Sequence, residues 1–187
     1  MPRHVQAAPS GEGVRIGVAL ARFNRAVTDR LLSGALEALA GHGVADDAVD
    51  VATVAGAFEL PLCAQRLAMA GRYDALVCLG AVVRGETPHF DFVAGEAARG
   101  IGAVALRFDL PVAFGVLTTD TMAQALARAG GDAGNKGYDA AVTALEMVQL
   151  FRALQKFRDG IAAGGARAGA PGALPARRPG RRRRGAR

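Results

Sequence analysis

Four short apolar runs, each followed by a segment with helical periodicity, constrain the fold of this chain more than any other feature. The runs have the length and composition of buried strands, and they occupy residues 14–20, 48–54, 75–81 and 112–117. Strands that alternate with helices favour a parallel sheet, because each strand is joined to the next by a crossover helix. The sequence therefore predicts an α/β fold, a three-layer α/β/α sandwich around a four-stranded parallel sheet.

The charge of the chain divides it into parts. The 187 residues carry a net charge of +6, but residues 1–150 hold 12 basic and 16 acidic residues, whereas residues 151–187 hold 11 and 1. The basic character therefore belongs to the end of the chain and does not indicate that the main part binds nucleic acid. We expect a flexible arm over 1–12, one domain over 13–158, and a disordered tail over 159–187 that is rich in Arg, Gly, Ala and Pro. Such a tail is either a solvated appendage or a weak binding segment for nucleic acid.

Cysteine content and hydropathy give the expected compartment. Cys63 and Cys78 lie within apolar patterns and lack CxxC spacing, so we expect reduced thiols and no metal site. No uncharged apolar run approaches the roughly 18 residues that a membrane-spanning helix needs. The beginning of the sequence also lacks the apolar core of a signal peptide. These features predict a soluble, cytoplasmic protein.

The segment 80–91 joins the third predicted strand to a helix expected over about 92–108. Main-chain N–H groups at such a junction face outward at the positive end of the helix dipole, so Gly85, Glu86 and Thr87 are candidates to surround an anion. His89 follows two residues later, and an imidazole with an unperturbed pKa near 6.5 suits proton transfer. The alternatives are an ordinary turn and a solvated loop histidine.

The ends of the first two predicted strands carry further candidates. Phe23 follows the first strand at the edge where parallel sheets bind ligands, and its ring either stacks on a flat heterocycle or lies in the core. Asn24 is a candidate N-cap for the next helix. After the second strand, Gly56 and Ala57 allow a ligand to approach the backbone. Glu59 either caps a helix or accepts hydrogen bonds from sugar-like hydroxyls.

The later part of the chain has weaker signals. Thr121 and Gln124 form a capping-box pattern for a short helix. The glycine-rich run 130–137 lacks the P-loop pattern and predicts a kink before a helix over about 138–158. Gly95, Gly100 and Gly102 interrupt the preceding long helix, which we interpret as close packing of a neighbouring backbone from the same or another subunit.

Several of these segments together resemble the lumazine synthase family. The string at residues 80–91, GAVVRGETPHFD, is similar to the signature of that family, and so are Arg22-Phe23-Asn24 and the string FGVLTT at 114–119. Residues 55–61 resemble the family's Pro-Gly-Ala-x-Glu motif, with Ala55 where proline is usual. The resemblance covers roughly residues 14–158 and implies a flavodoxin-like topology.

The resemblance implies a transferase of riboflavin biosynthesis. The implied reaction condenses 5-amino-6-(D-ribitylamino)uracil with 3,4-dihydroxy-2-butanone 4-phosphate to give 6,7-dimethyl-8-ribityllumazine, phosphate and water. It needs no cofactor and no metal, because the aromatic amine is itself the nucleophile. His89 is implied as the catalytic proton shuttle.

The resemblance also assigns substrate-binding residues. From the pattern alone Phe114 is a core residue and Arg128 is solvated, but in the family the Phe114 segment lines a neighbouring subunit's site and Arg128 reaches the substrate phosphate. The substrate-binding residues implied are Phe23, Ala57, Phe58, Glu59, Ala81, Val82, Val83, Glu86, Thr87, Phe114 and Arg128, with Asn24, Gly85 and Lys136 as a second tier.

The expected assembly is a homo-oligomer with active sites between subunits. The family implies a pentamer, and the Gly-Asn-Lys-Gly ending of 130–137 favours a sixty-subunit icosahedral shell, with a pentamer or decamer as alternatives. A functional link to riboflavin synthase is implied as well. The competing functional hypotheses are a flavodoxin-like module that binds flavin or phosphate without catalysis, and a shell protein that packages nucleic acid through its tail.

Overall fold

The structure, a computed structural model, describes residue 2 and residues 4–167. The chain divides into two compact units, Met1–Leu154 and Gln155–Arg187. The first unit contains all the strands found in the described residues. The described part of the second unit is helical up to Arg167. Most of the predicted tail, residues 168–187, lies outside the described residues.

The central sheet has four parallel strands in the order β2-β1-β3-β4. The strands are β1 (Ile16–Ala21), β2 (Val49–Val54), β3 (Ala75–Val83) and β4 (Val112–Thr119). This sheet confirms the predicted α/β class and its flavodoxin-like topology. The third and fourth strands each continue two residues beyond their predicted ends, because β3 and β4 stay paired up to Val83 and Thr119.

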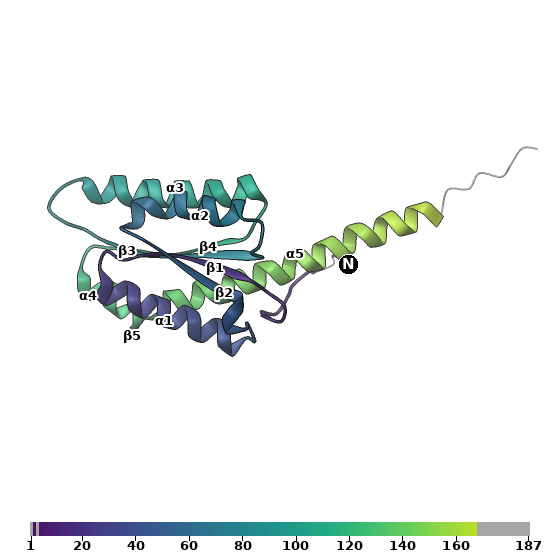
Figure 1. The fold of residues 1–187 in the computed structure, drawn as a ribbon, viewed down its shortest axis with the longest axis horizontal. Helices are drawn as coiled ribbons and strands as arrows, with labels where there is room; N and C mark the ends of the chain where they lie inside the picture. Colours follow the sequence, from purple (N-terminus) through teal and green to yellow (C-terminus); the bar gives the residue numbers. More distant parts are fainter. Residues whose placement is uncertain (1, 3, 168–187) are drawn as a thin grey trace, which may run out of the picture. The chain divides into compact units, whose positions relative to one another are not determined.

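Helices cover both faces of the sheet (Figure 1). The helices α2 (Leu60–Met69) and α3 (His89–Phe108) lie on one face. The other face carries α1 (Arg25–Gly41), α4 (Met122–Ala127) and the first part of α5 (Lys136–Arg167). Two short 3₁₀ helices, η1 (Asp46–Ala48) and η2 (Ala57–Glu59), flank β2.

Alternation along the strands divides the core between these two faces. In β1, Ile16 and Val18 pack towards α1 and α5, whereas Ala19 and Ala21 pack towards α2 and α3. Successive side chains of a strand point to opposite faces, so a strand covered on both sides is apolar throughout. All six residues of β1 are buried accordingly.

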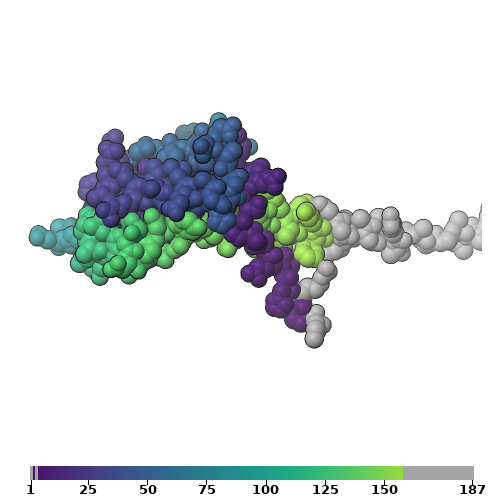
Figure 2. Space-filling view, turned by 90° about the horizontal axis from the view of Figure 1, so that it is seen from below, coloured from purple at the N-terminus to yellow at the C-terminus, as the bar shows by residue number. Residues whose placement is uncertain are grey.

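The glycine-rich segment before α5 differs from the predicted kink. It forms a short antiparallel hairpin of β5 (Ala129–Gly131) and β6 (Gly134–Asn135), and α5 follows directly. The side-chain Oδ1 of Asn135 accepts hydrogen bonds from the N–H groups of Gly137 and Tyr138, and Nδ2 donates to the carbonyl of Arg30 in α1 at 2.9 Å. Figure 2 shows the blue-violet surface of α1 beside the green surface of this hairpin. The cap by Asn135 explains why α5 begins two residues earlier than predicted, and its end at Arg167 lies nine residues beyond the expected one.

The close packing predicted at the three glycines of α3 is found at one of them. A Cβ at Gly100 would lie 2.7 Å from the side chain of Pro61, so this glycine permits the close contact of α3 with α2. Gly95 and Gly102 have no neighbouring atom within 4 Å of such a Cβ. Packing within the described chain therefore accounts for one of the three glycines.

The fold also bears on the predictions about the cysteines, membrane-spanning helices and metal ligands. Cys78 is buried in β3 and Cys63 is half-buried, and both are free thiols. Burial, and to a lesser extent the neighbouring Cys63, raises the pKa of Cys78 to about 12. Among the described residues, no helix is both long and apolar enough to cross a bilayer. No group of three or more metal-ligating side chains occurs in that part of the chain either.

Candidate active site

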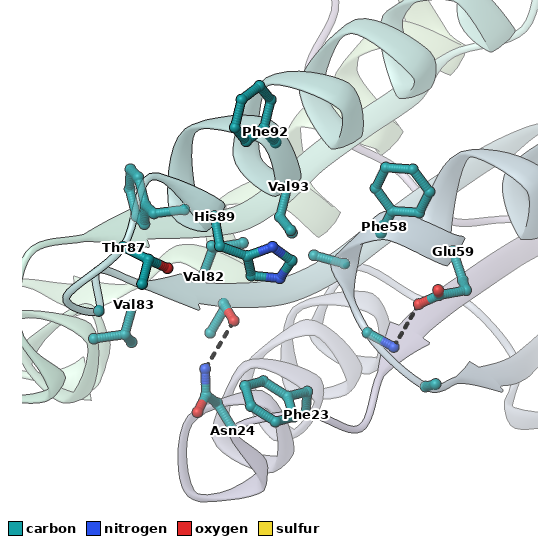
Figure 3. A pocket seen from close by; sticks show the side chains of 16 residues that line it. Phe23, Asn24, Phe58, Glu59, Val82, Val83, Thr87, His89, Phe92 and Val93 are labelled. Atoms are coloured by element: carbon teal, nitrogen blue, oxygen red, sulfur yellow. Dashed lines mark hydrogen bonds between the residues drawn. The ribbon is translucent and has the colours of Figure 1, made fainter.

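A cavity of about 610 Å³ lies at the carboxyl ends of β1, β2 and β3 (Figure 3). The chain leaves β1 to form β2 on one side of it and later β3 on the other, so this is the topological switch point of the sheet. Ligands of open α/β sheets bind at such points. The lining residues are Phe23, Asn24, Ala55, Gly56, Ala57, Phe58, Glu59, Ala81, Val82, Val83, Gly85, Thr87, His89, Phe90, Phe92 and Val93.

Three aromatic rings of this cavity are largely solvent-exposed. The exposed fractions are 69% for Phe23, 57% for Phe58 and 70% for Phe92. The alternative that Phe23 belongs to the core is therefore wrong. Exposed phenylalanine rings around one concave site offer apolar faces on which a flat ring system can stack.

Asn24 connects two strand ends at the bottom of this site. It occupies the N-cap position of α1, as predicted, with a left-handed backbone at φ 61°. Its main-chain carbonyl accepts hydrogen bonds from the N–H groups of Val27 and Thr28, and its side chain does not cap the helix. Nδ2 instead donates to the carbonyl of Ala81 at 3.0 Å, which ties the end of β1 to β3. The predicted N-cap position is therefore confirmed, with the main-chain carbonyl and not the side chain of Asn24 as the acceptor.

The segment after β2 places Glu59 at the cavity. The N–H of Gly56 donates to Oε2 of Glu59 at 2.9 Å, so one carboxylate oxygen performs the local capping that was one of the two interpretations. Within the described residues, Oε1 makes no hydrogen bond. It is available to a hydroxyl group of a ligand.

His89 is the first residue of α3, three residues before the predicted start of that helix. The residue is exposed, and its imidazole points into the cavity (Figure 3). The ring thus faces the same space as Phe23 and Glu59. A proton donor and acceptor is positioned where a ligand held by those residues would lie.

The loop between β3 and α3 supplies main-chain donors. Gly85 and Thr87 line the cavity, whereas Glu86 does not. In the described part of the chain, no hydrogen bond occupies the N–H groups of Gly85, Glu86 or Thr87. A loop with free amides before a helix N-terminus suits an anionic group such as a phosphate.

Of the remaining predicted residues, Glu86 lines neither this cavity nor a second one, in which the other three lie. Phe114, Arg128 and Lys136 line a space of about 390 Å³ beside the edge strand β4 and the start of α5. Phe114 is 44% exposed, so the interpretation as a core residue is wrong. The Arg128 guanidinium donates to the carbonyl of Gln124 at 3.1 Å, and the ammonium of Lys136 pairs with Asp139 at 2.7 Å. A single chain thus separates the predicted site residues into two groups.

Five residues that line the first cavity were not among the predicted site residues, namely Ala55, Gly56, Phe90, Phe92 and Val93. A signal for two of them was present. Once α3 begins at His89, Phe92 and Val93 lie three and four residues further on, which is the same face of the helix.

Fold and cavity together define a class of protein. It is a flavodoxin-like α/β protein whose switch-point site combines exposed aromatic rings, a carboxylate, an imidazole and free main-chain amides. Such a site suits a flat heterocycle that carries hydroxyl groups, next to an anion.

Comparison with known proteins gives the family. The sequence profile of 6,7-dimethyl-8-ribityllumazine synthase matches residues 13–152. A 6,7-dimethyl-8-ribityllumazine synthase from Desulfatibacillum aliphaticivorans is 57% identical over 150 residues, which are 80% of this chain and 97% of that protein. The chain belongs to the 6,7-dimethyl-8-ribityllumazine synthase family, which confirms the resemblance. It is accordingly a transferase of riboflavin biosynthesis.

Proposed function

We propose that this chain condenses 5-amino-6-(D-ribitylamino)uracil with 3,4-dihydroxy-2-butanone 4-phosphate to give 6,7-dimethyl-8-ribityllumazine, phosphate and water. The observation that carries this proposal is the convergence on one cavity of Phe23, Glu59, His89 and the loop that begins at Gly85. Each group matches one part of the two substrates.

The binding roles follow from the chemistry of those parts. The pyrimidine ring stacks on Phe23, and ribityl hydroxyls donate to the carboxylate of Glu59. The phosphate is bound by the amides of residues 85–87, which the helix dipole of α3 supports. Ala57, Phe58 and the end of β3 at residues 81–83 form the apolar floor and walls. The side chain of Asn24 ties the segment after β1 to β3.

The reaction is a series of proton transfers around two new bonds. The aromatic amine of the uracil attacks the ketone, and loss of water gives an imine. Elimination then releases phosphate, and tautomerisation generates the second carbonyl, which the ribityl-bearing nitrogen attacks to close the ring with loss of water. His89 accepts and returns protons during these steps. Holding both substrates together contributes an effective molarity worth about 7–11 kcal/mol, and proton transfer adds on the order of 10²–10⁴ in rate.

The complete site requires a second subunit. Phe114 and Arg128 lie in the second cavity, so they serve the first cavity of a neighbouring chain, where the Arg128 guanidinium reaches the substrate phosphate and Lys136 assists. A ring of five chains repeats this shared site around one axis. We further propose that such pentamers build a sixty-subunit shell, and light scattering of the purified protein measures its mass directly.

Three finer points belong to the same proposal. The enzyme works in the cytoplasm, where its product passes to riboflavin synthase. The arginine-rich tail binds nucleic acid weakly. Loss of salt-sensitive nucleic-acid binding on deletion of residues 160–187 tests the role of the tail.

Product formation tests the activity itself. The purified protein is mixed with both substrates, and the lumazine chromophore is followed by absorbance against reactions that lack either substrate or contain heat-denatured protein. We expect protein-dependent product, which would exclude a binding module without catalysis. Product at the rate of the denatured control would reject the proposed function.

A further inference from the structure

Arg84 joins three elements at the edge of the candidate active site. It directly follows β3, and its N–H donates to the carbonyl of Thr119 at 2.9 Å, which continues the pairing of β3 with β4. Its side-chain Nε donates to Asp120 at 2.9 Å, just after β4. The terminal NH2 group donates to Asp91 at 3.3 Å, in the first turn of α3.

The same guanidinium also stacks on an aromatic ring of the cavity wall. Its central carbon lies 4.0 Å from the centroid of Phe90, which is a favourable cation–π distance. Hydrogen bonds to Asp120 and then to Asp91 raise the pKa of Arg84 above its usual value, so the group stays charged throughout the working pH range. A planar fork with several donors can serve two carboxylates and a ring at once, which an ammonium group does less well.

This arrangement matters for the loop that Arg84 precedes. The loop consists of residues 85–88. It follows Arg84, which comes directly after β3, and it ends where α3 begins at His89. The amides of residues 85–87 are unpaired within the described chain, and a Cβ at Gly85 would meet no atom within 4 Å, so neighbouring packing does little to hold the loop. The main chain of Arg84 fixes the first end of the loop, and its side chain fixes the other end through Phe90 and Asp91.

We propose that Arg84 is a positioning residue that sets the spacing between the anion-binding amides of residues 85–87 and the His89 imidazole, a role that rests on the proposed function. Arg84 does not line the cavity. It acts through the two ends of the loop, and through Asp120 it ties the loop to the strand beside it.

The exposure of these groups separates positioning from a role in global stability. The side chain of Arg84 is 43% exposed, and those of Asp91 and Asp120 are 62% and 71% exposed. Ion pairs at such exposure contribute little to the free energy of unfolding. Loss of Arg84 should therefore change the loop and leave the fold intact.

Steady-state kinetics test this role with three variants and a control. The variants are Arg84→Met, Arg84→Lys and Asp120→Asn, and the control is Arg99→Met. This control removes an arginine of α3 whose ion-pair partner among the described residues is Glu96, on the surface. We expect Arg84→Met to raise KM for the phosphorylated substrate about 10-fold and to change KM for the pyrimidine less than about 2-fold, because Phe23 and Glu59 are held by β1 and β2. Arg84→Lys should recover part of the loss, and Arg99→Met should behave as the original protein does.

A second measurement does not depend on catalysis. A glutamate-specific protease cuts after Glu86 when the loop opens, and mass spectrometry identifies the fragment that ends there. We expect faster cutting at Glu86 in Arg84→Met and Asp120→Asn, an unchanged rate after Glu37 in α1, and an unchanged thermal midpoint. Inorganic phosphate should slow the cut in the original protein more than in Arg84→Met.

The outcomes separate this proposal from the proposed function. Unchanged KM values together with unchanged cutting at Glu86 would overturn the role of Arg84. Increased cutting at every glutamate, or an equal rise in KM for both substrates, would show that Arg84 has a general structural role. Either result would also overturn the proposed positioning role. Loop-specific opening in a protein that forms no product would support Arg84 and reject the activity. If Arg84→Met does not fold, the milder Arg84→Lys and Asp120→Asn decide by the same criteria.

Discussion

Phe23 shows most directly how a single residue links sequence to site. A phenylalanine that is 69% exposed gains little from the hydrophobic effect in the isolated chain, which leaves its ring available for the proposed stacking on the substrate. The sequence left open whether this ring was buried. Its position just past β1, followed by the left-handed Asn24, turns the ring away from the core and towards the cavity.

We expect Phe23→Ala to raise KM for the pyrimidine substrate about 2- to 10-fold, because the ring's contribution to stacking is lost. The thermal midpoint should stay unchanged, since the ring is not part of the core. Phe23→Trp keeps an aromatic face and should retain the original KM. Steady-state kinetics and thermal unfolding measure both effects, and a lowered midpoint without a change in KM would place the ring in the core.

His89 allows an equally specific prediction. Replacement of His89 by alanine should lower kcat about 10²- to 10⁴-fold and leave some activity, because holding the substrates together persists without the imidazole. His42 is the matched control, since its Nδ1 is hydrogen-bonded to the carbonyl of Ala38 at the end of α1, away from the cavity. His42→Ala should keep full activity. A wild-type kcat in His89→Ala would remove the proposed proton shuttle.

At the level of elements, the sequence predicted the strands better than the connections. Apolar runs such as those of β1 and β3 mark buried parallel strands, because both faces of the sheet are covered. Pro88 was a signal for the early start of α3, since proline is common at the start of a helix. The signal was not used, because residues 80–91 were interpreted as one loop motif. The hairpin of β5 and β6 has too few residues to show any periodicity.

The contact of α1 with α5 gives a prediction about stability. A Cβ at Gly137 would overlap the main-chain carbonyl of Leu31, whereas a Cβ at Gly102 in α3 would meet no atom within 4 Å. Gly137→Ala should therefore lower the free energy of unfolding by about 1–3 kcal/mol through overpacking. Gly102→Ala should raise it by about 0.5–1 kcal/mol through helix propensity.

Denaturant unfolding at equal protein concentration compares the two variants, since assembly links apparent stability to concentration. An unchanged midpoint for Gly137→Ala would mean that α1 and α5 separate more easily than this packing implies. A loss of stability or of assembled mass in Gly102→Ala would identify the open side of α3 as a contact between subunits.

For the whole molecule, the separation of the site residues into two cavities could not be derived from the pattern. Phe114 lies within a predicted strand, and a strand pattern alone does not distinguish core from an exposed edge position. Arg128 resembles any solvated arginine at the end of a short helix. The family resemblance, and not the periodicity, assigned both residues to a site shared between subunits.

Subunit mixing tests that shared site. Arg128→Ala should mainly raise KM for the phosphorylated substrate, and His89→Ala should lower kcat. Each variant is therefore weakly active at low substrate concentration. When the two are unfolded together and reassembled in equal amounts, about a quarter of the sites combine an intact His89 with an intact Arg128 from different chains. We expect activity to rise towards that fraction of the original value. Activity equal to the mean of the two separate variants would show that each chain works alone.

The loop after β3 also has a consequence for resistance to inhibitors. An inhibitor that carries a phosphonate in this loop would bind to peptide groups, which every amino acid supplies, and not to the side chains of Glu86 or Thr87. Exchanging those side chains would then remove little affinity. A resistant strain would have to alter the path of the backbone, and that path also places the imidazole that we propose as the proton shuttle.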